Sequence, residues 1–118
     1  MKLKYWYHMW RLSNKYNFSK VGFIKFFLGY HISKNYRLVY TVNKKRDMVV
    51  GFNFIEYKRI KRLIVDKAFR GRGLGKKLIP KYCQLVYTDN KRRAVGFYEK
   101  MGFKVIGKRN DKVYIMKR

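Results

Sequence analysis

The sequence predicts one α/β domain over residues 1–118, with a mixed sheet and helices on both of its faces. Three observations lead to this fold class. Apolar and polar residues alternate in several short segments, which is typical of strands with one buried face. Two other segments carry apolar residues at helical spacing, and one strand runs into a glycine-rich loop that opens a helix. Hydrophobic residues make up 47% of the chain, which is enough to bury a core.

The N-terminal third predicts one strand and one helix. Residues 1–11 alternate loosely, which favours a strand with Trp6 and Trp10 on one face. Ser19 is a typical helix N-cap, and it precedes a single helix expected over residues 20–33. The apolar side of this helix would carry the residues at helical spacing, which are Val21, Ile24, Leu28 and Ile32.

The rest of the chain predicts strands with two further helices. We expect strands over residues 36–42, 48–55, 60–65, 82–88, 103–107 and 112–116. The first two flank a polar turn and predict an antiparallel hairpin, and the last two predict a closing hairpin. One helix should begin at about Gly73 and be interrupted by Pro80, because proline ends or kinks a helix. The last helix should run over residues 91–100 from a cap at Asp89 or Asn90.

Glycine stands at every second position of the loop after the central strand, at Gly71, Gly73 and Gly75. Glycine adopts backbone conformations closed to other residues, so successive N–H groups can converge on one ligand. The helix that follows adds the positive end of its dipole, and Arg70 and Arg72 add charge. The spacing matches neither the dinucleotide fingerprint nor the nucleoside-triphosphate loop. The loop therefore predicts a site for an anion.

Two motifs resemble the GNAT superfamily of N-acetyltransferases. Arg70, Gly73 and Gly75 fall on the fixed positions of its acetyl-coenzyme A signature, Arg/Gln-x-x-Gly-x-Gly/Ala. Val65 closes the strand before that signature. Residues 97–103 read FYEKMGF, which is similar to the run that ends the last helix of the family. The resemblance implies a GNAT-like mixed, mostly antiparallel sheet with a trimmed N-terminal helical region.

The resemblance also implies acetyl-coenzyme A as cofactor. Its pantetheine arm is expected to bond to the backbone near Leu63 and Val65, in a gap between the strands over 60–65 and 82–88. Asn90 is either a displaced pantetheine contact or a helix cap, and Lys76 is either a phosphate contact or a solvated side chain. The pyrophosphate is expected on the N–H groups of Arg70, Gly71, Arg72, Gly73, Leu74 and Gly75.

Tyr98 resembles the family tyrosine that donates a proton or hydrogen bond to the leaving sulfur, and the alternative is a core aromatic. Many members place a glutamate on the central strand as general base, but that strand carries arginine and lysine here. Glu56 is the nearest carboxylate, and Lys58, Arg59 and Lys61 favour its ionised form, which makes it a weak base. A water chain, or an acceptor amine that loses its proton easily, would need no carboxylate.

The chain has 31 Lys and Arg against 6 Asp and Glu, for a net charge of +25. The basic residues are spread over both halves, with 13 in residues 1–60 and 18 in residues 61–118. Such a surface attracts polyanions, so a nucleic acid or an acidic protein is the expected partner. The alternative is that the many lysines reflect the codon usage of an AT-rich genome and that the only polyanion the protein binds is coenzyme A.

Three functions remain open at this point. The first is an acetyltransferase whose acceptor is a nucleic acid or is bound to one. The second is an acetyltransferase of a protein or small amine, with incidental charge. The third is an inactive GNAT-fold module that binds nucleic acid through basic and aromatic side chains.

Composition sets further expectations. Cys83 is the only cysteine, so no intrachain disulfide can form and a cytoplasmic setting is expected. His8, His31 and Cys83 lack metal-ligand spacing, so no metal site is expected. No apolar run reaches the ~18 residues of a membrane span, so no membrane partner is expected. The sequence does not set the oligomeric state, and a homodimer is one option because trimmed sheets often cover an edge with a second copy.

Overall fold

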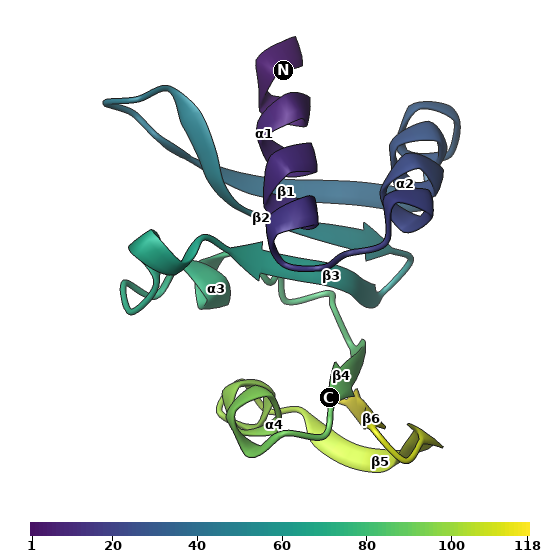
Figure 1. Ribbon diagram of the computed structural model, residues 1–118. Helices are drawn as coiled ribbons and strands as arrows, with labels where there is room; N and C mark the ends of the chain where they lie inside the picture. Colours follow the sequence, from purple (N-terminus) through teal and green to yellow (C-terminus); the bar gives the residue numbers. More distant parts are fainter.

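The computed structural model describes residues 1–118 and confirms the α/β class (Figure 1). One six-stranded sheet has the order β1-β2-β3-β4-β6-β5. All neighbouring strands are antiparallel except β3 and β4, which are parallel. The elements are α1 Leu3–Lys15, α2 Lys20–Ile32, β1 Tyr36–Asn43, β2 Met48–Glu56, β3 Arg59–Val65, a 3-10 turn η1 Lys67–Phe69, α3 Leu74–Lys77, β4 Leu85–Asp89, α4 Arg92–Glu99, β5 Lys104–Asn110 and β6 Val113–Lys117.

The helices cover opposite faces of the two halves of the sheet. Helices α1 and α2 lie over β1, β2 and β3, whereas α4 lies beside β5 on the other side (Figure 1). Each face has its own cluster of buried side chains. The first contains Tyr5, Trp6, Met9, Leu12, Phe23, Phe26, Val49, Phe52, Phe54 and Ile64. The second contains Ile55, Ile60, Ile79, Cys83, Val86, Tyr98, Phe103 and Met116.

The strand predicted over residues 1–11 is wrong, because this segment forms helix α1. The buried residues are Tyr5, Trp6, Met9, Leu12 and Ser13, which recur at the three- and four-residue spacing of a helix. The polar residues Lys4, His8, Arg11 and Lys15 recur at the same spacing on the other side, so the segment is an amphipathic helix and the apparent two-residue alternation arose by chance. The expectation of a single N-terminal helix is therefore wrong as well.

Helix α2 begins at the predicted residue and ends one residue earlier than predicted, and the Ser19 hydroxyl accepts a hydrogen bond from the Gly22 N–H at 3.2 Å. The expected inward side is wrong, however. The stripe at helical spacing is exposed, and Phe23 and Phe26 face the sheet instead. The ring of Phe26 stacks on that of Phe54 with centroids 4.0 Å apart. Because this helix is apolar all round, spacing alone could not identify the buried side. The exposed stripe is Val21, Ile24, Leu28 and Ile32.

The two predicted hairpins and the central strand are confirmed. Strand β4 begins at Leu85, three residues later than expected. Helix α3 ends at Lys77, before Pro80 is reached, because the next two residues enter the core. There the carbonyl of Leu78 accepts a buried hydrogen bond of 2.9 Å from the Asn53 side chain. None of the helices has both the length and the apolar character that a membrane span requires.

Candidate functional site

Strands β3 and β4 separate soon after they meet. Their parallel pairing joins Arg59 to Leu85 and Ile60 to Val86, and it stops there. The next residue of β3, Lys61, has no partner on β2, because the register passes from the Ile55–Ile60 pair directly to Phe54 and Arg62. This β-bulge bends β3 at the point where the gap opens.

The backbone of β3 turns hydrogen-bonding groups into this gap. The Asp66 N–H donates to the Val50 carbonyl at 2.8 Å. In an antiparallel ladder this bond makes Val65 and Gly51 a non-hydrogen-bonded pair, and Leu63 occupies the same position two residues earlier. The amide groups of Leu63 and Val65 therefore point away from β2, toward the side of β4. The sequence predicted these two residues at this place.

The loop after β3 leaves a run of backbone donors free. The N–H groups of residues 71–76 make no hydrogen bond in the structure. Gly71 and Gly73 have φ values of 82° and 74°, which favour glycine, and both lie open to solvent. Helix α3 has only four residues, so its dipole adds less than the sequence suggested. Such a run of consecutive free N–H groups is typical of an anion-binding nest.

The two arginines of the loop contact aromatic rings of the protein. Arg70 turns back onto the protein, where its Nε donates to the Val65 carbonyl at 2.9 Å and its guanidinium lies over a tyrosine ring. Arg72 stacks on Phe69, and Lys76 is exposed. Packing favours glycine at Gly75, because a Cβ there would lie 3.1 Å from the Phe97 ring of α4.

Tyr98 lies in the core on α4, with 8% of its surface exposed. Its ring packs edge-on against Phe97 and Phe103, at centroid distances of 5.0 and 5.7 Å. Burial raises the pKa of the Tyr98 hydroxyl to about 12, against the opposing effect of the Arg62 charge. The hydroxyl is thus protonated at neutral pH and is available as a hydrogen-bond donor.

Arg62 is a half-buried cation on β3. Its Nη2 donates to the Tyr16 carbonyl at 2.7 Å, its guanidinium lies over Phe18, and its Nε is buried without a partner. Burial lowers the pKa of this group. Glu56 ends β2 and forms an ion pair with Lys61, at 3.3 Å between Nζ and Oε2. Strand β3 itself carries no carboxylate, and the nearest one, on Glu56, is held in this ion pair.

Asn90 does not cap α4, so that interpretation is wrong. The N-cap residue is Lys91, which makes no side-chain cap, and its N–H donates to Asp89 at 3.1 Å. The Asn90 amide instead donates to the Asp111 carbonyl at 3.0 Å and ties β4 to the closing hairpin. No group of three or more His, Cys, Asp or Glu side chains gathers anywhere in the structure.

The comparisons with known proteins converge on one family. The GNAT acetyltransferase domain model matches residues 19–105, from the cap of α2 into β5. The peptidyl-lysine N-acetyltransferase YjaB of Salmonella typhimurium is 36% identical over 69 residues, which cover 53% of this chain and 48% of that protein. The chain thus spans about half the length of the curated relatives it matches.

Two solved structures share the fold. The ribosomal-protein-S18-alanine N-acetyltransferase of Escherichia coli superposes with a TM-score of 0.68 at 16% identity, over 98% of this chain and 88% of that one. The PaiA N-acetyltransferase of Thermoplasma acidophilum, solved with coenzyme A, gives 0.66 at 18% identity, over 90% and 74%.

Proposed function

Because this chain belongs to the GNAT acetyltransferase family, we propose that it is an N-acetyltransferase that uses acetyl-coenzyme A. One observation carries the proposal above all. The backbone amides of β3 that point away from β2 are followed along the chain by six free N–H groups in the next loop. The first set suits a ligand with amide groups, and the second suits a pyrophosphate.

The residues along this path fit coenzyme A by their chemistry. The amides of Leu63 and Val65 would bond the pantetheine arm as an added strand. The N–H groups of residues 71–76 would hold the pyrophosphate, with Arg72 and Lys76 supplying charge. Arg70 acts differently in this proposal, because it fixes the loop to the end of β3 through its bond to Val65. Asn90 stays outside the site.

Acetyl-coenzyme A supplies an acetyl thioester, and Tyr98 is the donor that faces its sulfur in our proposal. An ordinary thiol titrates near pH 8.5. Proton transfer from a hydroxyl with a pKa of about 12 to a thiolate is therefore uphill by roughly 5 kcal/mol. Tyr98 would accordingly stabilise the departing sulfur by a hydrogen bond and keep its own proton. The thiolate takes its proton from solvent or from the acylated amine.

The acceptor amine must lose a proton before it can attack. An ordinary lysine amine titrates near 10.4, so roughly one in two thousand is neutral at pH 7. A cation about 10 Å away lowers an amine pKa by roughly one unit at an effective dielectric of 20. Arg59 and Arg62 flank the bulge where the gap opens, so they would favour the neutral amine. Water then suffices as the base, with Glu56 as the alternative.

We propose the side-chain amine of a protein lysine as the acceptor. The names of the curated relatives from two bacteria, both peptidyl-lysine N-acetyltransferases, support this choice. The second candidate is an amine of a nucleic acid, or of a protein bound to one, and the net charge of +25 favours it.

The test is thermal stabilisation by acetyl-coenzyme A, followed by an assay of thiol release. At a concentration 100 times Kd, binding adds ~2.7 kcal/mol, which raises the Tm of a domain this size by about 10 °C. Gly73→Asp places a carboxylate in the nest and should abolish the shift. Gly107→Asp is the matched control, because a side chain there meets open space in β5.

The outcomes separate the three functions. A Tm shift in wild type and Gly107→Asp, with none in folded Gly73→Asp, supports the nest as the coenzyme site. Thiol release with lysine peptides but not with nucleic acids supports the protein acceptor. A Tm shift without thiol release for any amine would mean an inactive module. If acetyl-coenzyme A does not raise the Tm of the wild-type protein, the proposed function is wrong.

A further inference from the structure

A cavity of about 750 Å³ lies at the end of the sheet away from the glycine loop. It is bounded by the start of β1, the turn between β2 and β3, and the residues that lead into β4. Its walls carry four basic side chains, one carboxylate and two tyrosines. The lining residues are Lys34, Asn35, Arg37, Glu56, Tyr57, Lys58, Arg59, Tyr82 and Leu85.

Hydrogen bonds join the three segments of this cavity into one frame. The Tyr57 N–H donates to the Asn35 carbonyl at 2.7 Å, which fixes the β2–β3 turn to the start of β1. The N–H groups of Gln84 and Leu85 both donate to the Lys58 carbonyl, at 2.8 and 3.2 Å, which fixes the same turn to β4. The walls are therefore held in place without a ligand.

The charge of the cavity is positive and its guanidinium groups are oriented. The Arg37 guanidinium lies over the Tyr82 ring at 5.3 Å, and that of Arg59 lies over Tyr87 at 4.5 Å. The carboxylate of Glu56 is neutralised by its ion pair with Lys61, whose side chain is no part of the lining. No other acid lines the cavity, so an anionic ligand meets only attraction there.

Tyr57 stands out among the residues of the cavity. Its φ is +57°, whereas the other positive-φ residues that are not glycine are Asn17 and Asp47, types that tolerate this conformation. A bulky aromatic there is strained, and the residue is 64% exposed. The Asn35 side chain donates to its hydroxyl at 3.1 Å and steadies the ring. The turn thus holds an aromatic face in solvent beside the basic side chains.

We propose that this cavity binds single-stranded nucleic acid. The backbone phosphates would lie against Lys34, Arg37 and Lys58, and one base would stack on the Tyr57 ring. Basic grooves with exposed aromatic faces bind single strands in this way, because every base has a face that can stack. The path of β3 puts the cavity roughly 20 Å from the glycine loop. The cavity is therefore separate from the coenzyme loop, although Glu56 and Arg59 line it and also lie on the acceptor side of the proposed acetyltransferase site.

An acidic polypeptide is the competing occupant, and the aromatic ring argues against it. Carboxylates would be satisfied by the basic side chains alone and would gain nothing from an exposed ring in a strained turn. A duplex would also leave the ring unused, because its bases are already stacked. The basic groups and the ring together fit a strand with unstacked bases.

The experiment measures fluorescence anisotropy of a labelled oligothymidylate of about ten nucleotides. Tyr57→Gly is the decisive variant, because glycine suits the positive φ and the protein should fold at least as well. We expect its affinity to fall roughly tenfold, the effect of losing one stacked base. Thermal melting confirms that the variant is folded.

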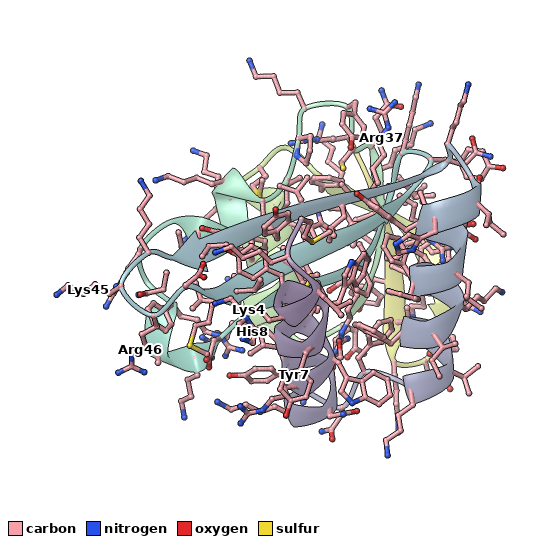
Figure 2. The ribbon with its side chains drawn as sticks, turned by 90° about the horizontal axis from the view of Figure 1, so that it is seen from above. Lys4, Tyr7, His8, Arg37, Lys45 and Arg46 are labelled. Carbon is pink, nitrogen blue, oxygen red and sulfur yellow. The ribbon has the colours of Figure 1, made fainter.

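Two double variants that remove the same charge give the matched comparison. Arg37→Ala with Lys58→Ala changes the cavity, whereas Lys45→Ala with Arg46→Ala changes the tip of the β1–β2 hairpin. Figure 2 shows Arg37 at the opposite end of β1 from Lys45 and Arg46. The cavity pair should lower the salt slope by about two and weaken binding much more than the tip pair does.

Each outcome decides the proposal. Equal affinity of Tyr57→Gly and wild type would overturn it, as would equal losses in the two double variants. Equally tight binding of a polyglutamate of the same length would reassign the cavity to an acidic polypeptide. A parallel titration with oligouridylate states whether DNA or RNA is preferred. Acetyl-coenzyme A should stabilise all of these variants equally.

Discussion

The buried hydroxyl of Tyr98 makes a specific prediction about stability at high pH. Its pKa is about 12 in the folded protein and near 10 in an unfolded chain, so the folded state keeps the proton more firmly. Its stability contribution is fully present below pH 10 and is lost as the pH rises toward 12. Two pKa units correspond to roughly 3 kcal/mol, of which roughly 2 kcal/mol is lost by pH 11.5.

The measurement compares urea unfolding of wild type and Tyr98→Phe at several pH values from 8.5 to roughly 11.5. The variant lacks the titrating group, so the difference between the two free energies of unfolding isolates Tyr98. The Cys83 thiol and the lysines are present in both proteins, and their titration cancels. Tyr57→Phe is the matched control, because that residue is 64% exposed in the folded protein.

We expect wild type to lose about 2 kcal/mol relative to Tyr98→Phe over this range, and Tyr57→Phe to follow wild type. A difference that stays constant with pH would refute the reasoning. It would show that the hydroxyl ionises as easily in the folded state as in the unfolded chain. The argument that Tyr98 retains its proton during acetyl transfer would fall with it.

Three further predictions concern single residues. Gly29→Ala should lower stability by roughly 1 kcal/mol, because its Cβ would lie 2.6 Å from the Tyr36 ring. Gly96→Ala should raise stability by roughly 0.5–1 kcal/mol, because a Cβ there meets open space in α4 and alanine favours a helix. Melting temperatures of the two variants test both signs. Burial lowers the pKa of His8, whose Nδ1 accepts a 3.2 Å hydrogen bond from the backbone of β2. Stability should therefore fall as the pH drops through about 6.5, and less so in His8→Asn, as calorimetry can show. Burial raises the pKa of Cys83 to about 11. A thiol reagent at pH 8 should therefore react with Cys83 only as fast as the protein unfolds locally to expose it. Reaction at the rate of a free thiol would contradict this prediction.

Local signals gave the central part of the fold. The polar turn between β1 and β2 and the Ser19 cap each act through the residues next to them, so the sequence was sufficient to predict them. The strand predicted over residues 1–11 is wrong because a loose two-residue alternation coincides there with the helical spacing of the buried residues. The buried side of α2 was decided by the stacking of Phe26 on β2, a contact distant in sequence.

The candidate site divides in the same way. Leu63, Val65 and the glycine loop follow one another along the chain, and their placement could be predicted. The inward turn of Arg70 and the burial of Arg62 depend on Tyr16, more than 40 residues earlier. The basic cavity is formed by three segments that are distant in sequence, so no single stretch of the sequence predicted it. The roles of Glu56 and Tyr98, the homodimer and the cytoplasmic setting stay predictions.

The early end of the β3–β4 pairing also has a mechanical meaning. Only two residue pairs hold the two halves of the sheet together at this line, while every other pair of strands is joined by five or more. A load applied across the sheet would open this seam first. A ligand lying along it, bonded to both strands, would carry part of that load. Occupancy of the gap should thus stiffen the protein as a whole, and its motion would report whether a ligand is bound there.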